Sequence, residues 1–431
     1  MKAVRKEIMP WVTLTCVQTD KFKTNCLSIN LLTQLRRETA SLNALVPSVL
    51  RRGSEGFPDM ESVAKHLGGL YGASLEPYVR KKGEIQAVGF GANFIDDKYA
   101  PGGEKLLERI GEMMGEILLS PVTRGGLLLE EYVTSERDKL IEKLDARINE
   151  KRSYSMQRLF ELMCFSEDYA VDRNGSPETA EQIDSQSLTH RYNELLQQSP
   201  IEIFYCGSSD FERVGGAMLK ALNLLPRGEM ALELGTDIRM NSVEDKPRYY
   251  SEEMDVTQGK LAIGFRLGRC MEEPNPAAIK VMNAVFGGSV TSKLFMNVRE
   301  KLSLAYFASS LADVNKGIMA VSSGIEFENF EKARDEIFLQ LDAVKNGDVT
   351  DDELLWGSRY LASVYRSCMD DPDMLEDFYL SQNIAGESFG PEEFADMCEA
   401  VTKDEVVNIA KGIECDAVYF LKGLTKGGAN E

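Results

Sequence analysis

Histidine is scarce in this sequence: only His66 and His190 occur among 431 residues. Histidine is the commonest metal ligand and the usual general base, so its scarcity restricts the chemistry open to the chain. His66 has Ser62 and Leu70 one turn away, and neither is a metal ligand. His190 has Glu194 at i+4, but two ligands do not make a zinc site. We therefore interpret both histidines as structural or surface residues.

Paired cysteines are also missing, since none of the eight cysteines forms a Cys-x-x-Cys pair. Several lie in apolar runs, as Cys206 does at the end of Ile201 to Cys206, where a free thiol behaves as a small buried hydrophobe. This distribution argues against a disulfide framework. With no targeting segment, it leads us to expect a protein of the reducing cytoplasm.

Long apolar runs and basic clusters are the other absences. No run of about eighteen apolar residues occurs, so we expect no membrane-spanning helix. The segment from Ile8 to Val17 faintly resembles a signal peptide, but Pro10 interrupts it, and we interpret the segment as a first β-strand. The formal charge of −20 argues against a nucleic-acid partner. It suits solubility, and it could also attract basic peptides.

Common catalytic motifs are not found either. Val88-Gly89-Phe90-Gly91 is a glycine pattern within a strand, and no GxxxxGK[ST] phosphate loop occurs. Gly207-Ser208-Ser209 follows a strand but lacks the flanking glycine of a nucleophile elbow. Paired acids such as Asp96-Asp97 lie in turn contexts, where carboxylates are usually solvated or cap helices.

One stretch does indicate a function, and it runs from Gly287 to Tyr306. Glycines are followed by a predicted helix with apolar residues at three- and four-residue spacing, and then by an extended run. Arg299 and Tyr306 place a cation and a phenol near the corner between helix and strand. The alternative interpretation is that Arg299 is a solvated cation on a helix and Tyr306 an ordinary aromatic residue of a strand.

This stretch, with its glycines, leucine-bearing helix, Arg-Glu-Lys and Leu-Ala-Tyr, resembles the C-terminal-half signature of the M16 (pitrilysin-type) metallopeptidases. The resemblance implies that Arg299 and Tyr306 hold a substrate peptide beside a zinc carried by an N-terminal half. It also implies an α+β fold of two homologous halves, each a mostly antiparallel sheet packed with helices. Segments at 174–183 and 350–354 extend the resemblance over nearly the whole chain.

An internal repeat supports this organisation. A shift of 234 residues places Gly53 on Gly287 and Gly83 on Gly317, and both halves predict the order strand, helix, helix, strand, helix. A polar segment with glycine and proline predicts a linker. We therefore expect a first half at 1–225, a linker at 226–247 and a second half at 248–431.

Periodicity predicts the individual elements. The runs 11–18 and 25–31 predict antiparallel strands joined at 19–24. Further predicted strands lie at 84–93, 201–206, 260–267, 317–325 and 416–421. Predicted helices lie at 41–52, 59–70, 103–119, 275–286, 292–302 and 329–345, within 127–164, after the N-cap Ser176, and after two capping boxes, Thr350 with Glu353 and Thr402 with Glu405.

The catalytic motif of the family is degenerate here. An active M16 peptidase carries His-x-x-Glu-His on a first-half helix, in which the imidazoles bind zinc and the glutamate activates a bound water of pKa about 7. The two histidine positions here hold Ala44 and Ser48, and the glutamate position holds Pro47. None of these three residues can perform the reaction.

The distal zinc ligand is also replaced. When the later helix is anchored on Glu136-Arg137, the position of the family's third ligand holds Lys143, with Glu142 one step away. A lysine is a poor zinc ligand. The resemblance therefore implies that this chain carries no catalytic residue and no metal.

We accordingly expect a non-catalytic subunit that supplies Arg299 and Tyr306 to a zinc-bearing M16 homologue in a heterodimer, or to a second copy of itself. Arg299 would bind a substrate carbonyl, and Tyr306 would help to fix the scissile bond or stabilise the oxyanion. The peptide would add as a strand to a sheet edge. The alternatives are a peptide-binding or scaffold protein, an enzyme with an unrecognised site, and a structural subunit resembling the core proteins of respiratory complexes.

Overall fold

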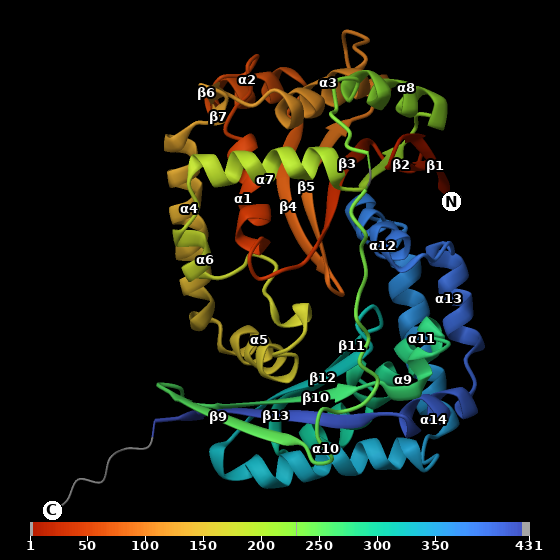
Figure 1. Ribbon diagram of the computed structural model, residues 1–431. Coiled ribbons are helices and arrows are strands. Elements are labelled where there is room, and N and C mark those ends of the chain that lie inside the picture. The colour runs from red at the N-terminus through yellow and green to blue at the C-terminus, as the bar shows by residue number, and fades with distance from the viewer. Residues whose placement is uncertain (1–2, 230, 425–431) are drawn as a thin grey trace, which may run out of the picture. The chain divides into compact units, whose positions relative to one another are not determined.

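The computed structural model describes residues 3–229 and 231–424, which divide into two compact units. Unit 1 contains residues 3–145, 171–235 and 368–390, and unit 2 contains 146–170, 236–367 and 391–424 (Figure 1). Each unit therefore includes one segment from the opposite half of the sequence. The packing units and the halves in sequence order are different divisions of the chain.

Unit 1 is built on a six-stranded sheet in the order β1-β2-β8-β3-β5-β4. All neighbours are antiparallel except β2 and β8. The first two predicted runs are β2 and β3, which run antiparallel as predicted, but β8 lies between them, so they do not pair directly. The strands are β1 (Ala3–Met9), β2 (Val12–Gln18), β3 (Thr24–Gln34), β4 (Ser74–Lys82), β5 (Ile85–Ile95) and β8 (Ile201–Gly207).

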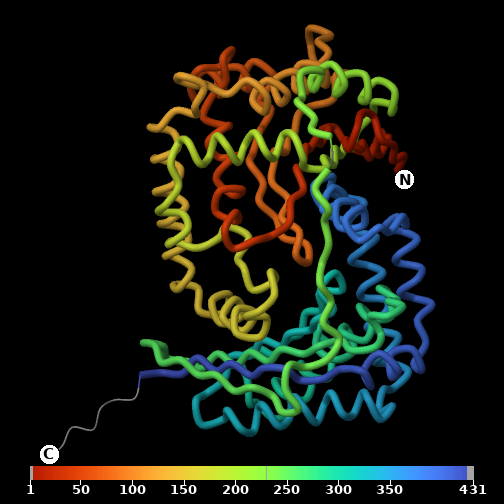
Figure 2. The backbone as a smooth tube through the Cα atoms, viewed as in Figure 1, coloured from red at the N-terminus to blue at the C-terminus, as the bar shows by residue number. Residues whose placement is uncertain are grey.

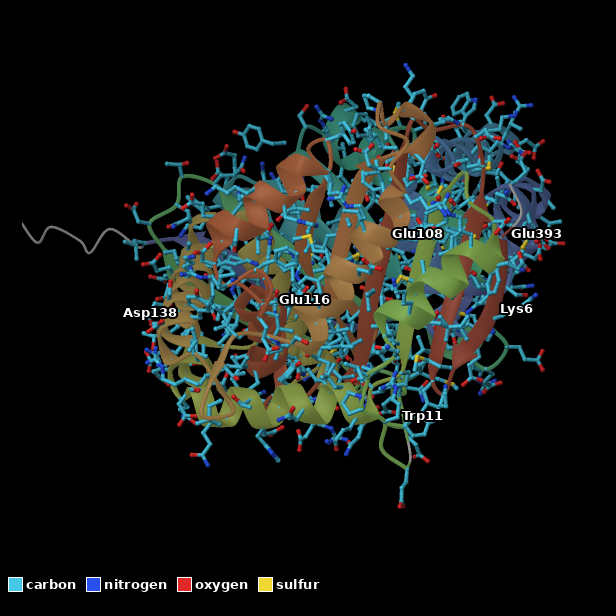
Figure 3. The ribbon with its side chains drawn as sticks, turned by 90° about the horizontal axis from the view of Figure 1, so that it is seen from above. Lys6, Trp11, Glu108, Glu116, Asp138 and Glu393 are labelled. Atoms are coloured by element: carbon cyan, nitrogen blue, oxygen red, sulfur yellow. The ribbon has the colours of Figure 1, made fainter. Side chains whose placement is uncertain are left out.

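The segment predicted as one strand, Ile8 to Val17, is two strands joined by a tight turn. β1 ends at Met9 and β2 begins at Val12, so Pro10 and Trp11 form the turn. Trp11 has a φ of 60°, in the left-handed region that side chains rarely adopt. Trp11 is labelled where it projects from this turn (Figure 3). An apolar run that crosses a turn cannot be distinguished from one strand by composition alone.

Helices cover both faces of this sheet. On one face α1, α3, α7 and α8 pack on a core that includes Leu27, Ile29 and Leu31 of β3. Glu108 of α3 binds Arg213 of α8 at 2.7 Å, and α3 is visible from above (Figure 3). The helices of unit 1 are α1 (Ala40–Leu50), α2 (Met60–Gly69), α3 (Leu106–Leu119), α4 (Glu130–Asp145), α6 (Pro177–Glu181), α7 (Ser185–Gln198), α8 (Phe211–Ala221) and α12 (Pro372–Ala385), with a small ribbon of β6 (Thr123–Arg124) and β7 (Leu127–Leu128).

The other face of the unit 1 sheet is covered by α12, which comes from the second half of the chain. The carboxylate of Glu376, 1% exposed, accepts hydrogen bonds from Ser28 (2.8 Å) and Asn30 (2.9 Å) of β3. Because strand side chains alternate between faces, β3 offers apolar residues to one side and polar ones to α12.

Unit 2 repeats this topology. Its sheet order is β11-β12-β10-β13-β9, with β9 and β13 parallel and the remaining neighbours antiparallel. These strands correspond in order and direction to β4-β5-β3-β8-β2. Gly83 and Gly317, which the repeat aligns, have φ of 58° and 70° in equivalent hairpin turns. The strands are β9 (Arg248–Met254), β10 (Gly259–Arg266), β11 (Ala305–Asp313), β12 (Ile318–Ile325) and β13 (Glu414–Gly423). The predicted α+β duplication is confirmed.

Helices also flank the unit 2 sheet. α5 from the first half lies on one face, and α10 lies on the other (Figures 1 and 2). Phe265 of β10 packs edge-on against Phe338 of α10, whereas a Cβ on the adjacent Gly264 would lie 2.4 Å from the sulfur of Met163 in α5. The helices are α5 (Lys151–Met163), α9 (Pro276–Asn283), α10 (Phe330–Lys345), α11 (Asp351–Cys368), α13 (Pro391–Ala400) and α14 (Lys403–Lys411).

The predicted helices 275–286 and 292–302 differ in type from the structure. α9 ends at Asn283, and the backbone continues as a π-helical segment, Ala284–Gly288. A second π-helical segment follows at Leu294–Lys301. π-helices account for well under 1% of residues and often mark functional sites. The sequence predicts correctly that these segments are helical, but the spacing of their apolar residues does not distinguish a π-helix from an α-helix.

Two further expectations concern thiols and membranes. All eight cysteines are free, and six of them are buried. Burial raises the pKa of Cys16 and of Cys206 to about 12, so these thiols stay protonated and unreactive. Over the described ranges, no helix is both long and apolar enough to cross a bilayer.

Candidate functional site

Three of the four residues predicted at degenerate zinc-motif positions, Ala44, Ser48 and Lys143, line one pocket of unit 1. Its volume is about 630 Å³. Ala44 and Ser48 line it from α1, one turn apart, and Lys143 lines it from α4. The structure therefore brings these three residues together. The third motif position, Pro47, is buried inside α1 and does not line the pocket.

One face of α4 forms a wall of this pocket. Glu136, Lys139, Leu140 and Lys143 all line it, at the spacing of a single helix face. Glu142, the neighbour considered as an alternative distal ligand, is not among the lining residues. The Glu136 carboxylate is engaged, since Arg52 lies 2.9 Å and Lys139 lies 2.8 Å from its oxygen.

The pocket does not fit a zinc ion. Ala44 has no donor atom, Ser48 has a neutral hydroxyl, and Lys143 contributes a positive charge where a carboxylate is needed. Throughout the described part of the chain, no group of three or more His, Cys, Asp or Glu residues is arranged to hold a metal. His190 and Glu194 form only an exposed pair, at 3.1 Å.

An open sheet edge runs along the same pocket. β4 is the last strand of the unit 1 sheet, and Pro77 to Arg80 line the pocket consecutively. The Leu75 carbonyl points outward, because it accepts a hydrogen bond from the Arg51 side chain at 2.6 Å. By strand alternation the peptide groups of Pro77 and Val79 also point outward. Pro77 has no N–H to offer, a common device at exposed edges.

Tyr78 forms the side of the pocket beside β5. Its ring lies over Gly91, where an added Cβ would be 2.4 Å from the phenol oxygen. The Arg80 guanidinium lies 4.3 Å from the ring centroid and pairs with Glu376 of α12. Burial, reinforced by Asp373, raises the pKa of Tyr78 to about 12. The phenol is therefore a neutral hydrogen-bond donor across the physiological range.

Arg299 lies in unit 2, within the second π-helical segment. Its side chain is 42% exposed and stacks over the Phe295 ring at 4.6 Å. Its one ion-pair partner within the described ranges is the adjacent Glu300, at 3.5 Å. Such an adjacent, exposed pair contributes little to stability, so the guanidinium remains accessible to a ligand.

Tyr306 lies at a β-bulge in β11. Ala305 pairs with Ile325 and Phe307 pairs with Gly324, so Tyr306 is the extra residue of the bulge. β11 is an edge strand, and Tyr306 is 59% exposed. Its hydroxyl donates to Glu326, and this hydrogen bond raises the pKa of the phenol. Bulges at sheet edges often redirect a side chain next to a functional site.

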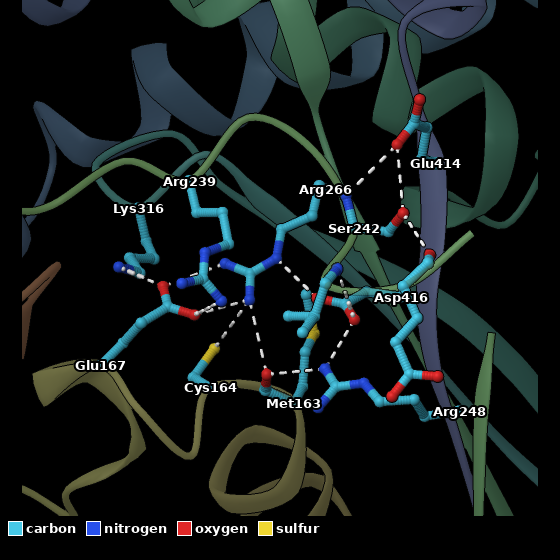
Figure 4. Close-up of polar contacts among 12 residues, drawn as sticks. Met163, Cys164, Glu167, Arg239, Ser242, Arg248, Arg266, Lys316, Glu414 and Asp416 are labelled. Carbon is cyan, nitrogen blue, oxygen red and sulfur yellow. Dashed lines mark hydrogen bonds and ion pairs between the residues drawn. The ribbon is translucent and has the colours of Figure 1, made fainter. Parts of the chain in front are cut away.

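Unit 2 contains a buried cluster of charged residues that the sequence did not predict. Arg266, fully buried, binds Glu167 through two contacts (2.6 and 3.0 Å) and Asp416 at 2.8 Å (Figure 4). Lys316 also pairs with Glu167 at 2.7 Å, and Arg248 with Asp416 at 2.6 Å. Alternating strands give no indication of such a cluster, because its members are far apart in sequence. It attaches the 146–170 segment to the sheet of unit 2.

Comparison with known proteins places this geometry in a family. Residues 182–355 match the model of the "Peptidase M16 inactive domain". The "Probable inactive metalloprotease YmfF" of Bacillus subtilis is 33% identical over 414 residues, which covers 96% of each chain. An "Uncharacterized zinc protease YmxG" of the same organism is 29% identical over 118 residues, or 26% of this chain and 28% of that protein.

Solved structures agree with the fold. A conserved protein from Enterococcus faecalis superposes with a TM-score of 0.88 at 27% identity, covering 99% of this chain and 100% of that one. A peptidase M16 inactive domain from Pseudomonas fluorescens gives a TM-score of 0.77 at 14% identity, covering 99% of each. At that lower identity the likeness concerns the fold alone.

Proposed function

Because the chain belongs to the M16 family of peptidases and its pocket lacks zinc donors, we propose that it is the substrate-binding subunit of a two-subunit zinc peptidase. The partner is a zinc-bearing M16 homologue, in a heterodimer; the alternative partner is a second copy of this chain, in a homodimer. In this assembly the partner carries the metal and activates water, and this chain supplies Arg299 and Tyr306.

The observation that carries this proposal is the contrast between the two sites. At the degenerate motif, Ala44, Pro47 and Ser48 offer no chemistry. In unit 2, Arg299 and Tyr306 are exposed on a π-helical segment and on a β-bulge, two irregular features that often accompany functional sites. Ser303, between them, has a φ of 49°, so the backbone of this corner is strained.

Each residue has a distinct role in the proposed mechanism. The Arg299 guanidinium donates hydrogen bonds to a backbone carbonyl of the bound peptide. The Tyr306 hydroxyl exchanges Glu326 for the substrate and donates to the oxygen on which negative charge develops. The peptide lies as an added strand along a sheet edge, so main-chain hydrogen bonds supply affinity. Zinc, when present in the partner, supplies the activated water.

The experiment begins with a tagged chain recovered from its own organism. We expect a His-x-x-Glu-His homologue to co-purify and the complex, but not the chain alone, to cleave peptides from a mixed library. Arg299→Ala and Tyr306→Phe should each lower kcat of the complex by about 10²-fold, the usual loss for one oxyanion donor.

Matched controls separate a catalytic role from a general surface effect. Tyr249 is 53% exposed on β9, at the opposite edge of the same sheet, so Tyr249→Phe should leave turnover unchanged. Arg359→Ala, an exposed change on α11, serves the same purpose for Arg299. Unchanged turnover in both test variants would refute the assignment of this corner.

A second candidate is a peptide-binding or scaffold protein with no proteolytic role. The open β4 edge beside a large pocket favours it, because this edge can bind a strand without any partner. It predicts peptide binding by the chain alone and no cleavage with any M16 partner.

A further inference from the structure

The pocket of unit 1 is positively charged, in contrast to the chain as a whole. Its lining contains four cations and two carboxylates, an excess of two positive charges, whereas the whole chain carries −20. The cations are Arg80, Lys139, Lys143 and Arg173, and the carboxylates are Glu136 and Asp373. The local charge therefore favours a ligand of the opposite sign from that suggested by the net charge.

Half of these cations are already neutralised by protein carboxylates. Arg80 pairs with the buried Glu376, and Lys139 pairs with Glu136, which Arg52 also contacts. Neither cation is therefore free to bind a further anion strongly.

Lys143 and Arg173 differ from the other two cations. Within residues 3–229 and 231–424, neither side chain forms an ion pair or a side-chain hydrogen bond. The lining carboxylate Asp373 is held elsewhere: it lies in the first turn of α12 and accepts hydrogen bonds from Asn93 at 3.3 Å and from Cys26 at 3.5 Å. Two cations thus remain for a ligand.

Neutral donors accompany these cations. Ser48 and Tyr78 also line the pocket, and the pKa of Tyr78, raised to about 12 by burial, keeps its phenol protonated. A carboxylate has two oxygens that can accept hydrogen bonds from such a mixed set of charged and neutral donors.

We propose that this pocket, where relatives bind zinc, binds the carboxylate of an acidic peptide segment laid along the β4 edge, with Lys143 and Arg173 as its counter-charges. The peptide's backbone bonds to the outward groups of Pro77 and Val79, and its glutamate or aspartate side chain enters the pocket. This inference rests on the proposed role in peptide binding for the nature of the ligand. It adds the class of sequence that is selected.

The geometry explains the selectivity expected. A neutral amide offers one acceptor oxygen and no charge. Replacing the carboxylate of the peptide by an amide therefore removes the charge that attracts both cations. A basic side chain would be repelled. Free anions such as inorganic phosphate could contact the same cations, but they would form no main-chain hydrogen bonds with the edge of β4.

The test compares labelled peptides that differ at one position, either Glu, Gln or Lys, by fluorescence anisotropy with the full chain. We expect the Glu peptide to bind about 10-fold more tightly than the Gln peptide, a difference of about 1.4 kcal/mol. Lys143→Met and Arg173→Met should each reduce this ratio, and Lys143→Glu should favour the Lys peptide instead. Lys65→Met, at an exposed lysine of α2 paired with Glu61, should leave the ratio unchanged.

The possible outcomes separate this inference from the function on which it rests. Equal binding of all three peptides would overturn the carboxylate site and leave peptide binding intact. Failure of every peptide to bind the chain alone would overturn both this inference and the second candidate function, whereas the two-subunit peptidase stands or falls with the co-purification experiment. Tighter binding of inorganic phosphate alone than of the Glu peptide, measured by calorimetry, would assign the pocket to a free anion and overturn the inference.

Discussion

Glu167 and Arg266 form a two-point ion pair in the interior of unit 2, although 99 residues separate them in sequence. Glu167 follows α5, a helix from the first half, and Arg266 ends β10, the central strand of the second-half sheet. The pair therefore fixes a transferred segment to the sheet that it covers. Buried charges are costly to desolvate, so each depends on its partner.

The first prediction concerns this pair. Glu167→Gln should lower the free energy of unfolding by about 3–5 kcal/mol, because it leaves the guanidinium of Arg266 and the ammonium of Lys316 without their shared counter-charge. Urea denaturation followed by circular dichroism measures the change. Glu393→Gln, at an exposed residue of α13 (Figure 3), should stay within about 0.5 kcal/mol of the unmodified chain. Equal effects of the two substitutions would contradict the assigned role.

The second prediction concerns acid stability. Burial alone would raise the pKa of Glu167, but the hydrogen bonds from Arg266 and Lys316 outweigh it and lower the pKa below the ordinary value of 4.5. The stability contributed by this carboxylate is therefore complete above pH 4.5 and is lost as the pH falls through the lower pKa of the folded state. Between pH 6 and pH 3 the unmodified chain should lose stability more steeply than Glu167→Gln. Parallel pH profiles would show that another carboxylate dominates acid unfolding.

The third prediction concerns the degenerate zinc site. Ala44→His, Ser48→His and Lys143→Glu combined should create a site for one zinc ion per chain, since all three positions line the same pocket. The two histidines without Lys143→Glu should bind more weakly by at least about 100-fold, as even outer partners of a metal contribute 10–100-fold. Metal analysis after dialysis distinguishes the two variants. Equal zinc content would mean that Lys143 does not face the metal position.

The fourth prediction contrasts two glycines. A Cβ at Gly89 of β5 would lie 1.9 Å from the carbonyl oxygen of Ile29 in β3, a backbone atom that cannot move aside. Gly89→Ala should therefore destabilise the fold by roughly 3 kcal/mol. Gly216, exposed in α8, has nothing within 4 Å of an added Cβ, so Gly216→Ala should stabilise by about 1 kcal/mol. Thermal unfolding measures both, and shifts of the same sign would contradict this account.

Much of the local structure could be predicted from the sequence because its causes are local. The capping boxes of Thr402 with Glu405 and Thr350 with Glu353 start α14 and α11 as predicted, through hydrogen bonds across three residues. Ser176 likewise caps α6. The repeat was also detectable, because the left-handed turns at Gly83 and Gly317 require the same residue type.

Long-range pairing could not be predicted in the same way. Nothing in β2 or β3 indicates that β8, nearly two hundred positions later, lies between them. The crossing of α5 and α12 into opposite units depends on buried contacts such as Glu376 with Asn30, which leave no local pattern. At the candidate site, motif spacing placed Ala44, Ser48 and Lys143 in one pocket. The excess of positive charge in the pocket could not be predicted, because its cations come from α4, β4 and the segment of Arg173, which are far apart in sequence.

The exchange of α5 and α12 has a consequence for how the polypeptide can be divided. A gene split between residues 226 and 247 would encode two fragments, each lacking the helix that covers one face of its own sheet. Each fragment made alone would expose that face and aggregate readily. Produced together, each fragment would supply the helix that the other lacks, so two polypeptides would assemble into one protein by complementation. Two domains joined only by a tether would fold without such complementation.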